Sequence, residues 1–184
     1  MLYIDIETTV SSTHPILDQY IESKCWLDKL WLYPETARIL AIGLKKDDQD
    51  IKIRYGDEKW MLVAINSIDT PDYLVWRNIK KFDIPFIIRR SLHYWIKLWP
   101  LFAWISSMKP REIKVIDLME IWSCNMWYTT LESCCLMLWL QNPKKYHHWS
   151  EISSMSAEEI KTYLIWDVQA NYDIYQFFKK YNVI

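Results

Sequence analysis

Two acidic residues close a short hydrophobic run at the start of the sequence. In Leu2-Tyr3-Ile4-Asp5-Ile6-Glu7, Asp5 and Glu7 stand two positions apart. On a β-strand this spacing places both carboxylates on the same face. Two like charges held side by side cost energy unless a cation neutralises them. The pair therefore indicates a cation site, although solvated acids at an exposed strand end would give the same pattern.

Two more segments carry residues that are able to join this pair. Asp83 stands near the start of an expected helix, two positions before Pro85, where both residue types are favoured. Tyr163 and Asp167 are four positions apart on an expected long helix and therefore share a face. Taken singly, each segment has an ordinary explanation: a helix cap for Asp83, and a commonplace helical pair for the other two.

The three segments together predict a centre for two divalent cations. Carboxylate oxygens are ligands that Mg²⁺ and Mn²⁺ prefer. Two such ions about 4 Å apart can activate a water and stabilise the leaving oxygen of a phosphoryl displacement. The chain has 22 Lys and Arg against 23 Asp and Glu, a formal net charge of −1, so overall charge gives no attraction for nucleic acid. Bound metal would supply the positive charge that the composition lacks.

The elements that must position these residues alternate between strands and helices. Hydrophobic periodicity and turn residues predict strands at 2–6, 38–44, 51–55, 73–75 and 113–116, and helices at 58–68, 83–94, 130–138 and 156–180, with a short helical possibility at 16–23. A Ser-x-x-Glu capping box, Ser156 to Glu159, marks the start of the last helix. This order predicts an α/β fold, a mixed β-sheet flanked by helices, in a single domain over residues 1–184.

The motifs resemble those of the DEDD exonuclease superfamily. Asp5-Ile6-Glu7-Thr8 resembles its first motif, residues 78–86 its second, and Tyr163-x-x-x-Asp167 its third in the tyrosine-bearing (DEDDy) subclass. Details outside the motifs are similar to the stand-alone exonucleases related to the proofreading domain of family-B DNA polymerases: Tyr33-Pro34-Glu35-Thr36, Ile116-Asp117-Leu118-Met119 and Pro143-Lys144-Lys145. The resemblance spans nearly the whole chain.

This resemblance implies a ribonuclease-H-like fold and a two-metal 3′→5′ exonuclease. The substrate would be the 3′ end of single-stranded DNA or RNA, with DNA favoured, and the products would be nucleoside 5′-monophosphates. Asp5, Glu7 and Asp167 would hold one Mg²⁺ or Mn²⁺ ion, and Asp5 would share the second with Asp83.

The resemblance also implies roles for residues beside the carboxylates. Tyr163 would position or deprotonate the attacking water, and orientation is favoured because a phenol with a pKa near 10 is a poor base at neutral pH. Thr8, Asn78 and Phe82 flank the carboxylates and are expected to contact the terminal nucleotide. Phe82 can stack on a base, although packing in the core is an equal alternative.

Basic and acidic residues near the second motif have more than one interpretation. Lys80, Lys81, Arg89 and Arg90 could approach the phosphate backbone, or they could form an ordinary solvated face. Asp117 is expected to be structural rather than a fifth ligand. A zinc site is a further alternative, built from Cys124, Cys134 and His147 or His148, but the sequence lacks a C-x-x-C pair and reduced thiols are the simpler expectation.

The content of glycine and tryptophan is unusual. The chain has 2 Gly and 12 Trp, where ordinary usage would give roughly 13 Gly. Trp139 follows a helix-like run at the usual place of a left-handed residue, and Trp95 borders a loop. The resembled family usually has glycine where Trp76, Trp139 and Trp149 stand. We hypothesise that UGA codons specify glycine in this gene; a Trp-rich protein is the alternative. Trp166, between Tyr163 and Asp167, would crowd the site.

Other functions share part of this pattern. A metal-dependent phosphodiesterase for small nucleotides would use the same carboxylates in a closed pocket. A nucleic-acid-binding or scaffolding domain would keep the fold with little or no turnover. The densest apolar stretch, residues 94–105, is interrupted by Lys97 and Pro100 and is shorter than the roughly 20 residues of a membrane span. No leader-like segment precedes the first expected strand, so a cytoplasmic protein without membrane partners is expected.

Overall fold

The computed structural model describes residues 1–11, 32–68, 72–98, 102, 115–124, 126–141, 152 and 154–184. These residues contain a five-stranded mixed sheet in the order β3-β2-β1-β4-β5. Its strands are β1 (Leu2–Val10), β2 (Ala37–Lys46), β3 (Lys52–Tyr55), β4 (Leu74–Trp76) and β5 (Val115–Asp117). The neighbours β1–β2 and β2–β3 are antiparallel, whereas β1–β4 and β4–β5 are parallel. The predicted α/β class with a mixed sheet is confirmed.

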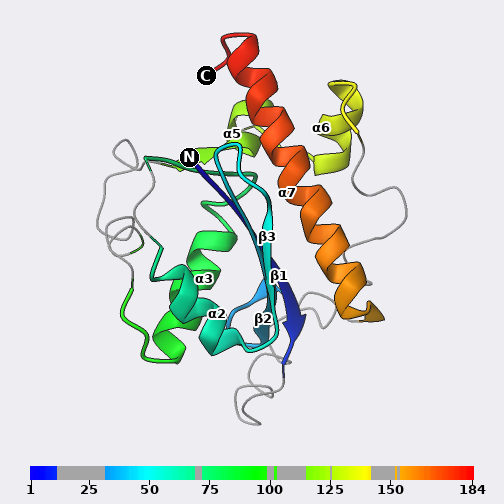
Figure 1. Ribbon diagram of the computed structural model, residues 1–184. Coiled ribbons are helices and arrows are strands. Elements are labelled where there is room, and N and C mark those ends of the chain that lie inside the picture. Colours follow the sequence, from blue (N-terminus) through cyan, green and yellow to red (C-terminus); the bar gives the residue numbers. More distant parts are fainter. Residues whose placement is uncertain are drawn as a thin grey trace.

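Helices cover both faces of the sheet (Figure 1). On one face α7 (Ala157–Lys180) lies against β1, β2 and β3. On the other, α2 (Glu58–Ile65) packs on β2 and on α3 (Asp83–His93). The short helices α5 (Leu118–Ser123) and α6 (Leu131–Met137) both contact α7. The sheet is therefore buried between helices, and β1 runs through its middle.

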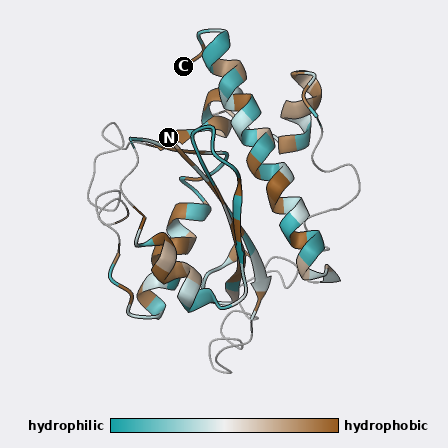
Figure 2. Cartoon of the chain, in the orientation of Figure 1, coloured by the Kyte–Doolittle hydropathy of each residue, from teal (hydrophilic) through white to brown (hydrophobic). Residues whose placement is uncertain are grey.

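The long helix α7 is specified by its cap and its apolar stripe. The predicted capping box is present: Ser156 N donates to Glu159 Oε2 at 2.7 Å, and Glu159 N donates to Ser156 Oγ at 3.3 Å. Hydrophobic and hydrophilic residues alternate along the helix with helical spacing (Figure 2). Asp167 falls within the buried stripe, so the helix carries a carboxylate against the sheet. Among the described helices, none is long and apolar enough to cross a membrane.

Most element boundaries differ from the sequence prediction by one or two residues, and β1, expected at 2–6, continues to Val10. The helix expected at 58–68 ends at Ile65, and the strand expected at 113–116 is described as Val115–Asp117, because residues 113 and 114 lie outside the described part. The helix α5 was not predicted, since six residues are too few for a helical period to be recognised. The helical possibility at 16–23 also lies outside the described residues.

A buried ion pair fixes α3 to α2. Arg90 donates through Nε to Glu58 Oε1 at 2.9 Å and through Nη2 to Glu58 Oε2 at 2.6 Å, and its Nη1 donates to the carbonyl of Pro34 at 3.0 Å. Glu58 Oε1 also accepts from the backbone of Ile39 at 2.7 Å, which anchors the pair to β2. Arg90 is only 3% exposed, so the suggestion that it reaches a phosphate backbone is wrong. It instead fixes the helix that begins with Asp83.

Candidate metal centre

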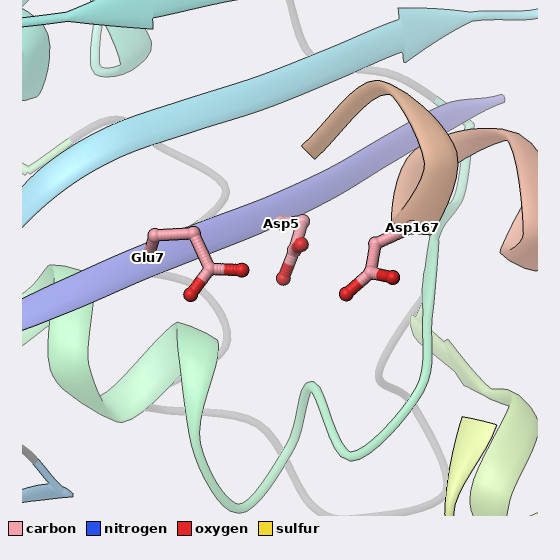
Figure 3. A group of neighbouring side chains, drawn as sticks. All are labelled: Asp5, Glu7 and Asp167. Carbon is pink, nitrogen blue, oxygen red and sulfur yellow. The ribbon is translucent and has the colours of Figure 1, made fainter. Parts of the chain in front are cut away.

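Three carboxylates from distant parts of the chain meet beside β1. Asp5 and Glu7 lie on β1 and Asp167 lies on α7, and each contributes a carboxylate oxygen within 4.8 Å of the others. All three residues are buried. Figure 3 shows the two side chains of the strand and the one of the helix gathered in the same space. The predicted same-face placement of Asp5 and Glu7 is therefore found, and Asp167 joins them.

A glycine opposite Asp5 allows α7 to come this close. Asp5 pairs with Gly43 across the β1–β2 ladder. A β-carbon built on Gly43 would lie 2.8 Å from Val168 Cγ2, closer than real β-carbons approach. The neighbour of Val168 in α7 is Asp167. The missing side chain of Gly43 thus leaves room for α7 to bring Asp167 towards Asp5.

Asp83 faces the same strand from another direction. It is the first residue of α3, whose N-cap is Phe82, so the capping role considered for Asp83 is not what the structure shows. The backbone N–H of Ile6 donates a hydrogen bond to the Asp83 carboxyl, and Ile6 stands between Asp5 and Glu7. Asp83 is not one of the three residues grouped within 4.8 Å, but it lines the same cavity.

This cavity has a volume of about 480 Å³ and contains most of the expected site residues. Its described lining consists of Asp5, Ile6, Glu7, Leu32, Trp76, Arg77, Asn78, Phe82, Asp83, Tyr128, Leu131, Tyr163, Asp167 and Asn171. It lies beside the part of β1 that continues past the paired residues of β4, since β4 pairs with β1 only at Leu74 and Val75. Four carboxylates therefore share one hollow beside β1, the central strand of the sheet.

The donor set fits hard divalent cations. Three buried carboxylates within 4.8 Å repel one another unless a cation lies between them, and oxygen-only ligands suit ions such as Mg²⁺ or Mn²⁺. Asp83 Oδ1 is buried and makes no hydrogen bond to any described residue, so this oxygen can accept a further partner. Burial raises the pKa of Asp83 from 3.8 to about 8, which means that its charge is poorly tolerated without a counter-ion.

Tyr163 lies one turn before Asp167 and lines the cavity. Burial raises the pKa of its phenol above the ordinary value of 10, and the negative charges of Asp167, Glu7 and Asp5 raise this pKa further. The phenol is therefore protonated at neutral pH. It can donate or accept a hydrogen bond, and its chemistry favours orienting a water over removing a proton from it.

The three expected nucleotide-contacting residues are placed differently. Asn78 and Phe82 line the cavity, whereas Thr8 is buried and does not belong to the described lining. The register of the β1–β2 ladder shifts between Glu7 and Thr8, where Leu40 of β2 is the extra, unpaired residue. The ring centroid of Phe82 lies 5.6 Å from that of Phe86, so Phe82 both packs on α3 and borders the cavity.

Asp117 has the structural role that was expected of it. Its Oδ1 accepts from the backbone N–H of Asn78 at 2.8 Å and from that of Met119 at 3.0 Å, and its Oδ2 accepts from that of Lys80 at 3.3 Å. Asn78 has a φ of 60°, and these bonds hold that left-handed turn in place. Lys80 is engaged with Glu120, with Nζ 2.6 Å from Oε2.

The remaining basic residues considered for phosphate binding lie outside the cavity lining. Lys81 is exposed, and Arg89 forms a long surface pair with Glu35 at 3.6 Å. In the zinc alternative, Cys124 is exposed and Cys134 is buried, and the two histidines fall outside the described residues.

Two aspects of the site were not anticipated. Trp166 borders a separate hollow of about 200 Å³ beside Tyr163 and does not line the acidic cavity, so the expected crowding is wrong. Sequence reasoning also missed Arg77, Tyr128 and Asn171 as lining residues. Only Arg77 carried a usable signal, because it directly precedes the second motif.

Comparisons with known proteins support the fold. No protein-family model matches the chain, and no curated protein matches it. Among solved structures, the chain is similar to the family B DNA polymerase from the hyperthermophilic archaeon Pyrobaculum calidifontis, with a TM-score of 0.67 and 13% sequence identity. The match covers 99% of this chain and 25% of the polymerase chain, so this chain spans about a quarter of that protein's length. At this identity the likeness concerns the fold, and the ribonuclease-H-like α/β prediction is confirmed.

Proposed function

We propose that the chain is a metal-dependent 3′→5′ exonuclease that acts on single-stranded nucleic acid, with DNA favoured. The convergence of Asp5, Glu7 and Asp167 within 4.8 Å carries this proposal. These three residues would hold one Mg²⁺ or Mn²⁺ ion, and Asp5 together with Asp83 would hold a second. The similarity of fold to a DNA polymerase supports nucleic acid as the class of substrate.

Different residues of the chain would have different roles in such a reaction. When bound, the ions would activate the attacking water and neutralise charge on the leaving oxygen. Tyr163 would orient that water through its protonated phenol. The hydrogen bond from Ile6 N–H would keep the Asp83 carboxyl turned to β1. Products would be nucleoside 5′-monophosphates.

The terminal nucleotide would lie against the second motif. Asn78 offers an amide and Phe82 an aromatic ring in the cavity, and a base can stack on such a ring. Thr8, also expected to contact the nucleotide, is the residue that the geometry supports least, because it is outside the described lining.

The test is an assay on matched DNA and RNA strands labelled at the 3′ end. With Mg²⁺ or Mn²⁺, labelled mononucleotide should appear first, and EDTA should abolish its release. Asp167→Asn should lower the rate by about a hundredfold or more, because it removes a carboxylate ligand of the first ion. Asp173→Asn is the matched control: Asp173 lies on the same helix, hydrogen-bonds to Gln169 and does not line the cavity.

The same assay separates the rival functions. Release confined to dinucleotides would favour a phosphodiesterase for small substrates. Binding of strands without turnover by the folded, metal-loaded protein would favour a nucleic-acid-binding domain. Either result would overturn the exonuclease proposal, and so would equal activity of Asp167→Asn and the unsubstituted chain.

A further inference from the structure

Arg77 is a cation in an otherwise acidic cavity. It follows the last residue of β4 and lines the hollow that also contains Asp5, Glu7, Asp83 and Asp167. Among the described lining residues it is the only one with a positive charge. Its place next to the centre, and not on the outer surface, requires a reason.

Most of the hydrogen-bonding capacity of this guanidinium is unused. Its Nη2 lies 3.9 Å from Met119 Sδ, and the guanidinium also hydrogen-bonds to the Cys134 sulfur; both are weak acceptors. Its Nε is buried and bonds to no described residue, and Arg77 forms no ion pair with any of them. Arg90, by contrast, uses Nε, Nη1 and Nη2 on Glu58 and Pro34. A buried donor without a partner is costly, so the structure leaves Arg77 ready for an acceptor from outside.

Tyr128 holds this guanidinium in place. Arg77 Cζ lies 5.0 Å from the centroid of the Tyr128 ring, a distance at which cation and ring attract each other. Tyr128 also lines the cavity. A planar guanidinium supported by a ring has little freedom left to lose, and its fork of N–H groups matches phosphate oxygens.

We propose that Arg77, supported by Tyr128, binds a phosphate group of the substrate strand beside the metal centre. This inference rests on the proposed function and extends it to a substrate-positioning residue outside the three motifs. Burial raises the pKa of Asp83, and the charge of Arg77 lowers this pKa in part, yet no close ion pair joins Arg77 to a described acid, so its N–H groups are left for another anion. With cations on the carboxylates, the anion that still needs a partner is the strand itself.

The test measures strand affinity and its dependence on salt. Binding of a fluorescently labelled oligothymidylate is followed by anisotropy in Ca²⁺, and its hydrolysis is followed in Mn²⁺. The variants are Arg77→Met, which keeps an unbranched stem, Arg77→Lys and Tyr128→Leu. Arg54→Met is the control because it removes an equal charge at another place. Arg54 lies over the Trp60 ring and lines a different hollow.

Arg77→Met should raise Kd and KM about tenfold or more and flatten the slope of log affinity against log salt by about 0.7, the value for one phosphate contact of a single strand. Arg77→Lys should keep the slope and regain part of the affinity. Tyr128→Leu should weaken binding while keeping the slope. Arg54→Met should leave Kd and KM within about twofold, because it makes no contact with the strand.

The outcomes separate this inference from the exonuclease proposal. If the unsubstituted chain degrades strands and Arg77→Met leaves KM and the salt slope unchanged, Arg77 does not bind phosphate although the enzyme assignment stands. If Arg77→Met lowers only kcat, or only the melting temperature, the inference is also overturned, because Arg77 then has a structural role and does not bind the strand. If strands bind with the expected slopes but no variant hydrolyses them, phosphate binding stands and the exonuclease assignment fails.

Discussion

Val168 packs directly on Gly43, the residue that pairs with Asp5 across the β1–β2 ladder. A β-carbon on Gly43 would lie 2.8 Å from Val168 Cγ2 and 3.4 Å from Leu164 Cδ2. Since Asp167 is adjacent to Val168, the closeness of helix and sheet at this point also determines whether the carboxylate of the helix reaches those of the strand. The metal centre and the packing of α7 therefore depend on the same contact.

Gly43→Ala should weaken both fold and metal binding. Overpacking of a core typically costs about 1–3 kcal/mol, and each kcal/mol lowers the melting temperature of a domain of this size by about 2–4 °C. Calorimetric titration should show weaker Mn²⁺ binding, because α7 and Asp167 must move outward. Adding Val168→Ala should recover part of both losses by making room for the new methyl group. If Gly43→Ala changes neither quantity, this contact does not set the geometry of the site.

Arg90→Met should unfold far more easily than the unsubstituted chain. It leaves the Glu58 carboxylate buried without its cation, which costs about 3–5 kcal/mol in comparable cases. Urea denaturation measures this loss. Replacing Glu58 by Met as well should restore part of the stability, because no uncompensated charge then remains.

Arg89→Met is the neighbouring control for that experiment. Arg89 is exposed, and its pair with Glu35 at 3.6 Å lies at the surface, so the cost should stay within about 0.5 kcal/mol. Equal losses for Arg89→Met and Arg90→Met would contradict the structural role assigned to the buried pair.

The metal-free protein should lose stability as pH rises through the pKa of Asp83. Burial raises that pKa from 3.8 to about 8, so folding favours the neutral carboxyl. The stability that the neutral Asp83 carboxyl contributes is fully present below about pH 4, where the group is neutral in both the folded and the unfolded chain. This stability is lost as pH rises through about 8. In EDTA, Asp83→Asn should therefore gain in melting temperature relative to the unsubstituted chain between pH 5 and pH 9, by at least about 2 °C.

If Asp83 is a ligand, saturating Mn²⁺ should reverse the order of the two melting temperatures. The ion stabilises the chain that binds it more tightly, so the unsubstituted protein should then melt above Asp83→Asn at pH 8. If Asp83→Asn still melts at a higher temperature than the unsubstituted protein in Mn²⁺, Asp83 is not a ligand of the metal centre.

Trp95→Gly and Trp139→Gly should each stabilise the protein. Both tryptophans have positive φ, 57° and 56°, and both are more than nine-tenths exposed. A left-handed backbone costs a side-chain-bearing residue about 1–2 kcal/mol, which glycine does not incur. Thermal unfolding should show a gain of about 1 kcal/mol for each substitution.

Trp60→Gly provides the contrast for the tryptophan substitutions. Trp60 lies in α2 without positive φ, where glycine lowers helix stability by about 1 kcal/mol.

The codons supply an independent readout: the recoding hypothesis expects UGA at Trp95 and Trp139, and UGG at most of the twelve positions would reject it. The left-handed position expected for Trp139 is confirmed, whereas Trp76 is buried in β4 without positive φ.

The sequence by itself determined the elements and the candidates. Period-two spacing placed Asp5 and Glu7 on one face of a strand, and a capping box marked the start of the helix that carries Asp167, because both patterns are local properties of the backbone. The order of strands and helices was sufficient for the α/β class.

Only the tertiary structure decided how these residues meet. The close approach of Asp167 depends on Gly43, far away in the chain, and the function of Arg90 depends on Glu58 in another helix. The placing of Arg77 beside Tyr128 in the acidic cavity follows from neither residue's local pattern. Such relationships depend on side chains that pack between different elements. The spacing of residues along one helix or strand does not show which residues of another element will contact it.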